Sequence, residues 1–233
     1  MPSLREIAAS REMINEADVT LTDYGLAVEA ALLAWLLYRA NAGRSPIKAF
    51  FVWFYLSISL AALLGGTYHG FFSNQANLTA TTLWRGVLVT IGVTAFTAWR
   101  IGALLVFSSN VAGWIGRIAA LELVLYSLAA IFLWQSFAFA IVNYLPAVLF
   151  LTFTLGLYFG RHRESSTLVG LAGLLLTFVA ASVQHFKVSL HPDYFNHNAF
   201  YHVLQGVALF AIFVAARRLV QEPPSKVNYA HQT

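Results

Sequence analysis

Apolar residues occur along this chain in seven long blocks separated by short polar stretches. The blocks lack the alternation of apolar and polar residues that a membrane β-strand shows. A bilayer core about 30 Å thick needs about 20 apolar residues in a spanning helix, so the pattern predicts an all-α, seven-transmembrane-helix bundle. The predicted helices cover residues 22–38, 49–72, 80–106, 115–134, 137–159, 166–186 and 198–219.

The connections between the predicted helices are short. The turn at 134–137 is so tight that the fourth and fifth helices must be antiparallel neighbours, and Pro146 should kink the fifth. We expect one membrane domain over 1–221, including a short N-terminal extension at 1–20, and a flexible tail over 222–233.

The composition agrees with a membrane protein. Hydrophobic residues make up 59% of the chain and charged residues 10%, whereas a soluble domain carries about 25% charged residues. The absence of cysteine excludes disulfides, thiolate metal sites and iron–sulfur clusters. The net charge of +4 does not indicate nucleic-acid binding, because Lys and Arg in a membrane protein mainly set topology.

Lys and Arg are unevenly divided between the two ends of the predicted helices. Ten lie on one side and four on the other, which predicts an outside N-terminus and a cytoplasmic C-terminus. The ten are Arg39, Arg44, Lys48, Arg100, Arg117, Arg161, Arg163, Arg217, Arg218 and Lys226; the four are Arg5, Arg11, Arg85 and Lys187.

Five of the seven histidines fall at the outer ends of the predicted helices. Three of them, His185, His191 and His197, are each better explained, taken alone, as solvated residues at the membrane interface. His69 and His202 lie in apolar sequence, where a neutral imidazole needs hydrogen-bond partners or a metal. Asp23 begins the first helix at the same depth, so it joins this cluster; the full set is His69, His185, His191, His197 and His202.

The start of the seventh helix carries several polar side chains. Asn196 is expected to cap it, which places His197 at the first helical position. Asn198 and His202 are spaced i, i+4 on one face, with Gln205 a further turn along. His197 and His202 are separated by about 140° around an ideal helix, so one shared ion would require an irregular first turn.

The second predicted helix ends in Gly65-Gly66-Thr67-Tyr68-His69-Gly70. Glycines within a span let a neighbouring helix approach closely. We expect this segment to pack against the seventh helix and to bring His69 to a shared site; ordinary packing of small residues, with His69 hydrogen-bonded, is the alternative. A zinc ion with three protein ligands and one open position is the usual catalytic arrangement, and Tyr68, Asn198 and Asp23 could orient the imidazoles.

The segments LTDYGLA, GGTYHGFF and FNHNAFYHVLQGVALF resemble the CREST superfamily of seven-helix membrane hydrolases, which includes alkaline ceramidases and the progestin and adiponectin receptors. The closest likeness is to an uncharacterised bacterial branch, which implies a bacterial inner membrane. In that superfamily one histidine of the second helix and two of an H-x3-H motif on the seventh hold zinc. The resemblance therefore implies that His69 and His202 are zinc ligands.

The sequence departs from the superfamily pattern at two places. The third ligand position falls on Asn198, and His197 lies one residue out of register. The superfamily serine four residues before the second-helix histidine is Gly65, so Thr67 is the nearest hydroxyl. Asp23 stands roughly where the superfamily has an acidic residue on the first helix.

The leading hypothesis is a zinc-dependent hydrolase of a lipid-like amide or ester, with zinc on His69, His197 and His202. Asp23 would handle the proton, Thr67 would assist at the oxyanion, and Tyr68, Asn198 and Gln205 would support the site. One alternative is a non-enzymatic membrane subunit or receptor-like protein that binds lipid, pigment or partner helices. Another is a haem protein with two axial histidines.

Overall fold

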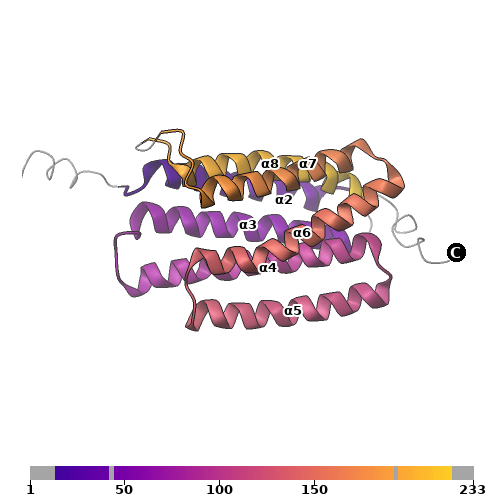
Figure 1. Cartoon of the computed structure of the whole chain (residues 1–233), viewed down its shortest axis with the longest axis horizontal. Coiled ribbons are helices and arrows are strands. Elements are labelled where there is room, and N and C mark those ends of the chain that lie inside the picture. Colours follow the sequence, from indigo (N-terminus) through magenta and orange to yellow (C-terminus); the bar gives the residue numbers. More distant parts are fainter. Residues whose placement is uncertain (1–13, 42–44, 192–193, 222–233) are drawn as a thin grey trace, which may run out of the picture.

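The computed structural model describes residues 14–41, 45–191 and 194–221. These residues form seven α-helices in one bundle, and they contain no β-strand beyond an isolated bridge (Figure 1). The helices are α2 (Ala17–Arg39), α3 (Pro46–Phe71), α4 (Leu78–Val106), α5 (Ser109–Phe132), α6 (Phe137–His162), α7 (Ser165–His185) and α8 (His197–Gln221).

Each of the seven helices is long and apolar enough to cross a membrane. The shortest has 21 residues, which at about 1.5 Å per residue spans a hydrocarbon core of about 30 Å. The predicted all-α architecture, with seven helices of membrane-spanning length and composition, is therefore confirmed. The predicted N-terminal extension and the tail at 222–233 fall largely outside the described residues.

The predicted helix ends agree with the structure to within three residues except at the start of α2, which begins five residues before the predicted position 22, and at the start of α5. This helix begins at Ser109, six residues before the predicted start at 115. Hydropathy detects only the apolar part of a helix, and α5 opens with the polar residues Ser109 and Asn110. The polar first turn of α5 is therefore helical, although its composition resembles that of a loop.

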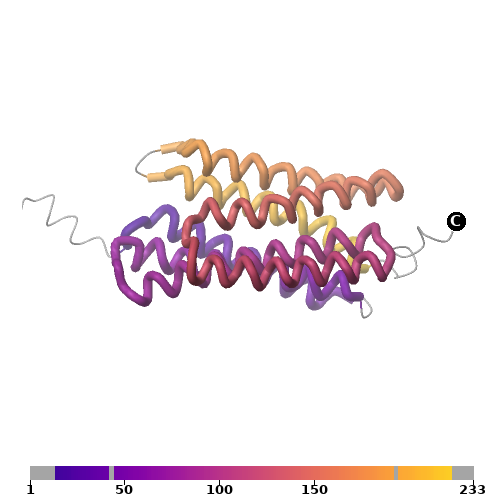
Figure 2. Tube along the Cα trace, turned by 60° about the horizontal axis from the view of Figure 1, so that its bottom comes forward, coloured from indigo at the N-terminus to yellow at the C-terminus, as the bar shows by residue number. Residues whose placement is uncertain are grey.

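The helices pack as neighbours in a closed arrangement. α2 packs on α3 and α8, α3 on α4, α4 on α5 and α6, and α7 on α8. Figure 1 shows α6 running obliquely from α4 toward α7, and Figure 2 shows α7 and α8 side by side along one edge. α6 continues as a helix through Pro146. α5 lies at the other edge and packs chiefly on α4.

Polar side chains connect several of these helices through the bundle interior. Tyr55 on α3 donates a hydrogen bond of 2.9 Å to the carbonyl of Leu209 on α8. Ser59 on α3 donates to the carbonyl of Ala27 on α2 at 2.8 Å. Lipid tails are as apolar as the helix surfaces, so such bonds and close packing must hold membrane helices together.

One end of the bundle collects the starts of α2, α4, α6 and α8 and the ends of α3, α5 and α7. We call it the site end. Three of its four helix starts, those of α4, α6 and α8, have a side-chain cap. At the start of α4, for example, the side chain of Asn77 accepts a 2.9 Å hydrogen bond from the backbone N–H of Ala80. This end therefore combines capped helix termini with the histidines discussed above.

Gly173→Ala should destabilise the bundle by about 1–3 kcal/mol, the usual range for overpacking. A methyl group at this position of α7 would lie 2.7 Å from the carbonyl oxygen of Ala208 and 3.0 Å from the backbone nitrogen of Ile212, so α8 would have to move away. Thermal unfolding in detergent measures the loss. Gly156→Ala is the matched control, because no atom lies within 4 Å of the added methyl; equal stability of the two variants would contradict the close α7–α8 approach.

Candidate functional site

A cavity of about 370 Å³ lies in the half of the bundle nearest the site end. Residues from every described helix except α5 line it. Most of its lining is aliphatic or aromatic, which is typical of sites for apolar ligands. Its polar lining includes two sets of side chains. The outer polar group comprises Asp23, His69, Asn198 and His202; the inner polar group comprises Tyr144, Tyr201 and Gln205; Thr94, Thr177 and Gln184 also line the cavity.

Asp23 and His202 form a buried contact between α2 and α8. The Nε2 atom of His202 lies 3.3 Å from Oδ1 of Asp23, and its Nδ1 atom lies 3.2 Å from the hydroxyl of Thr22. A neutral imidazole protonated on Nε2 satisfies both contacts, donating to the carboxylate and accepting from the hydroxyl. Asp23 is only 4% exposed, so this imidazole provides the partner that a buried carboxyl group requires.

The glycines of α3 allow Asp23 to enter the interior. A methyl group on Gly65 would lie 3.3 Å from Oδ2 of Asp23, and one on Gly66 would lie 2.9 Å from its Cβ. A methyl group on Gly70 would meet the hydroxyl of Thr20 at 2.9 Å. These glycines therefore face α2. The expectation that they face the seventh helix, α8, was wrong, because the helix in closest contact with this surface is the first one.

His69 on α3 is paired with a different carboxylate. Its Nδ1 atom lies 3.1 Å from Oε2 of Glu16, the residue that precedes α2. The hydrogen bond from His69 lowers the pKa of Glu16 below its ordinary value. The other ring nitrogen, Nε2, has no hydrogen-bond partner among the described residues. An imidazole oriented through Nδ1 by a carboxylate, with Nε2 free, is suited to moving protons.

Glu16 was not found by sequence reasoning. It lies just outside the first apolar block and looks like part of a polar extension. The available signal was its spacing: Glu16 precedes Asp23 by seven residues, which is about two helical turns and places both on one face.

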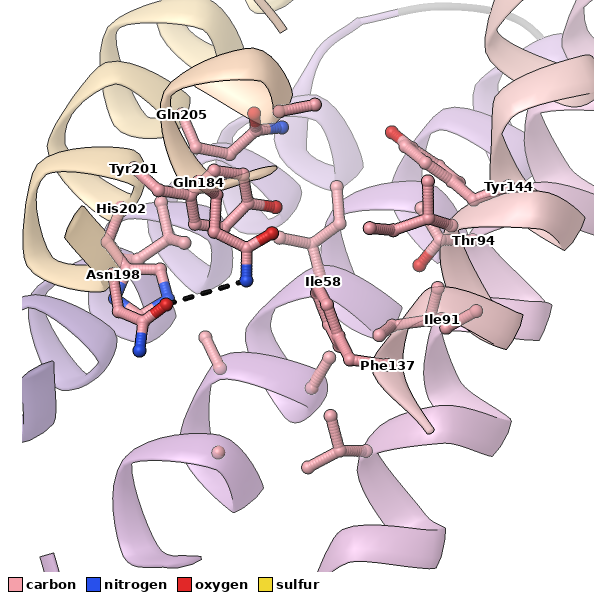
Figure 3. Close-up of a pocket in the computed structure, with 18 of the residues that line it drawn as sticks. Ile58, Ile91, Thr94, Phe137, Tyr144, Gln184, Asn198, Tyr201, His202 and Gln205 are labelled. Carbon is pink, nitrogen blue, oxygen red and sulfur yellow. Dashed lines mark hydrogen bonds between the residues drawn. The ribbon is translucent and has the colours of Figure 1, made fainter. Parts of the chain in front are cut away.

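Hydrogen bonds connect the polar start of α8 to α2 and α7. The side chain of Asn196 accepts from the backbone N–H groups of Asn198 and Ala199 at 2.8 and 3.2 Å, which confirms it as the cap. Its own N–H donates to Asp18 on α2 at 2.9 Å. The side-chain oxygen of Asn198 accepts from Gln184 on α7 at 3.4 Å, and Figure 3 shows this bond beside His202.

The remaining predicted residues lie outside the cavity. Thr67 donates to the carbonyl of Leu63 at 2.8 Å and contacts the hydroxyl of Tyr24 at 3.1 Å, so its hydroxyl is directed toward α2. Tyr68 does not line the cavity, and its ring packs on that of Trp84 at 5.0 Å between centroids. His197, at the first position of α8, is half-buried and does not line the cavity.

The three-histidine zinc set does not fit this arrangement. His69 and His202 share the cavity, but His197 lies outside it. Across the described ranges, no group of three or more His, Asp or Glu side chains is placed to hold a metal ion. Each cavity imidazole instead contacts a carboxylate, His69 with Glu16 and His202 with Asp23. We therefore derive no chemistry through a zinc ion.

A family model described as a family of unknown function (DUF6962) matches residues 19–221. The chain belongs to this family. No curated protein and no solved structure matches it. The matched range begins within α2 and ends with α8, so it contains both cavity histidines and Asp23.

Glu16→Gln should lower stability in a pH-dependent manner. Because folding lowers the pKa of Glu16, the stabilisation from its ionised form is complete above the ordinary pKa of 4.5 and is lost as pH falls through the lower folded value. The difference in thermal midpoint between wild type and Glu16→Gln should therefore be present above the ordinary pKa of Glu16 and should shrink as pH falls below it.

The control for this experiment is the same change in a His69→Asn background. Without the imidazole, Glu16→Gln should have little effect at any pH. A pH-dependent difference that persists in this background would assign the shift of Glu16 to another neighbour.

Proposed function

We propose that this protein is a membrane-embedded hydrolase of a lipid-like amide or ester. One observation carries the proposal: two imidazoles, each in contact with a carboxylate, line one end of a largely apolar cavity. The cavity suits an acyl chain, and the imidazoles supply groups that transfer protons near neutral pH.

In the proposed reaction His69 is the general base and then the general acid. Glu16 holds Nδ1, so Nε2 accepts a proton from water while the water oxygen attacks the carbonyl carbon. The proton then passes from Nε2 to the leaving nitrogen or oxygen as its bond to the carbonyl carbon breaks. The products are a fatty acid and an amine or alcohol.

Asp23 orients the attacking water in this scheme. His202 holds its Oδ1, and its Oδ2 lies in the space left by the absent side chain of Gly65. An oxygen in that position can accept a hydrogen bond from water and direct its lone pair at the carbonyl. The superfamily serine, for which Gly65 stands, would occupy part of this space.

The location of the reaction follows from charge distribution and resemblance. The excess of Lys and Arg at the end opposite His69 supports an outer-leaflet site with the N-terminus outside. The motifs around Asp23, His69 and His202 resemble the CREST hydrolases, which supports the same reaction class in a bacterial inner membrane.

Loss of the group that transfers the proton, or of the group that orients the water, should strongly reduce turnover. His69→Gln is expected to reduce kcat by about 10²–10⁴-fold, the usual contribution of general acid–base catalysis, and Asp23→Asn by about 10²-fold, the usual cost of a misplaced reactant. Fatty-acid release from a panel of long-chain amides and esters, measured on the purified chain in lipid nanodiscs, provides the test.

His185→Gln is the matched control, because His185 is exposed at the end of α7 and should leave turnover unchanged. Absence of fatty-acid release across the panel, with lipid still bound, would contradict the hydrolase and favour the non-enzymatic lipid-binding alternative.

Metal analysis tests the zinc expectation separately. Because His197 lies outside the cavity, we expect purified protein to carry well below one zinc ion per chain and turnover to survive dialysis against a chelator. About one zinc per chain, lost in both His69→Ala and His202→Ala, would instead show that the two imidazoles turn from their carboxylates toward an ion.

A further inference from the structure

The inner polar group has hydrogen-bonding capacity that the protein does not use. Gln205 on α8 is 5% exposed, and its Oε1 atom has no partner among the described residues. Figure 3 shows Gln205 and Tyr144 pointing into the cavity from opposite walls, α8 and α6. The hydroxyls of Tyr144 and Tyr201 likewise make no hydrogen bond within the described part of the chain.

Neighbouring side chains do not relieve this deficit. Thr94, which also lines the cavity, shares its hydroxyl with Ser57 at 2.8 Å and donates to the carbonyl of Thr90 at 3.1 Å. A buried amide oxygen without a donor is unfavourable, so a molecule in the cavity that supplies a donor to it gains binding free energy. Tyrosine hydroxyls both donate and accept, so they complement a hydroxyl better than a pure donor.

The depth of Gln205 relative to the outer polar group defines where the donor lies. Gln205 follows His202 by three residues, about 4.5 Å farther along the axis of α8. A molecule whose carbonyl lies among the outer polar group would therefore place an atom only a few bonds down its chain beside Gln205. Deeper lining residues such as Ile58 and Val148 are aliphatic and suit the remaining hydrocarbon.

We infer that the cavity selects a lipid carrying a hydroxyl close to its carbonyl group, bound by Gln205, Tyr144 and Tyr201. The ligand class is a β-hydroxyacyl chain: the hydroxyl donates to Oε1 of Gln205 and accepts from a tyrosine. This inference rests on the proposed function only for the position of the carbonyl. Recognition of the hydroxyl is a property of binding and does not require turnover.

A matched pair of long-chain methyl ketones tests the inference on the intact purified chain. Both ketones have the same chain length, one has a hydroxyl β to the carbonyl, and neither has a leaving group. Calorimetric titration in nanodiscs should show about five- to tenfold tighter binding of the hydroxyketone, the factor that a single net hydrogen bond provides.

Two variants assign that preference to the inner polar group. Gln205→Leu should reduce the preference for the hydroxyketone to less than about twofold. The variant should bind the plain ketone at least as tightly as wild type does, because the unpaired oxygen is removed. Tyr144→Phe, which keeps the aromatic ring and removes only the hydroxyl, should reduce the preference for the hydroxyketone in part. Tyr126→Phe is the control, since its hydroxyl donates to Leu88 between α5 and α4, and the preference should be unchanged.

Equal affinity of wild type for the two ketones would overturn the inference and indicate that water alone occupies the inner polar group. A preference that persists in Gln205→Leu would also overturn it. The proposed hydrolase activity is tested independently of this binding site. If the protein prefers the hydroxyketone but releases no fatty acid, the proposed reaction is rejected and the proposed binding site is retained.

Discussion

The contact between Asp23 and His202 is the constraint on which the site end depends. It joins α2, near the start of the chain, to α8, at its end, and it supplies the partner that a carboxyl group at this depth needs. Burial of either group alone would be unfavourable, so the two helices must remain in contact for both to be satisfied. The backbone N–H of Asn196 reinforces the same junction through Asp18.

The small residues of α3 make that contact sterically available. Gly65 and Gly66 leave no side chain between α3 and Asp23, so α2 lies close enough for Glu16 to reach His69 one turn nearer the end of α3. Two carboxylate–imidazole pairs thus arise from one close helix approach. In a bilayer, where apolar contact alone gives little preference between neighbours, such local complementarity determines which helices meet.

The cavity has a gradient of polarity along the helix axes. The ionisable side chains Asp23, His69 and His202 lie within about two turns of the helix ends. Gln205 lies about one turn deeper on α8, and the aliphatic Ile58 and Val148 line the inner part. This order fits an amphipathic molecule with its reactive group toward the surface and its chain toward the interior. It also agrees with the increasing energetic penalty for charge toward the middle of a membrane.

The sequence by itself determined the seven helices and the common depth of His69 and His202, because the need to span a hydrocarbon core acts on each apolar block separately. It did not determine how each helix is rotated or which neighbour it meets. The α3 glycines therefore turned out to face α2, His197 lies outside the cavity, and Glu16 pairs with His69 from beyond the apolar block. Those features depend on contacts between distant segments, which only the packed bundle specifies.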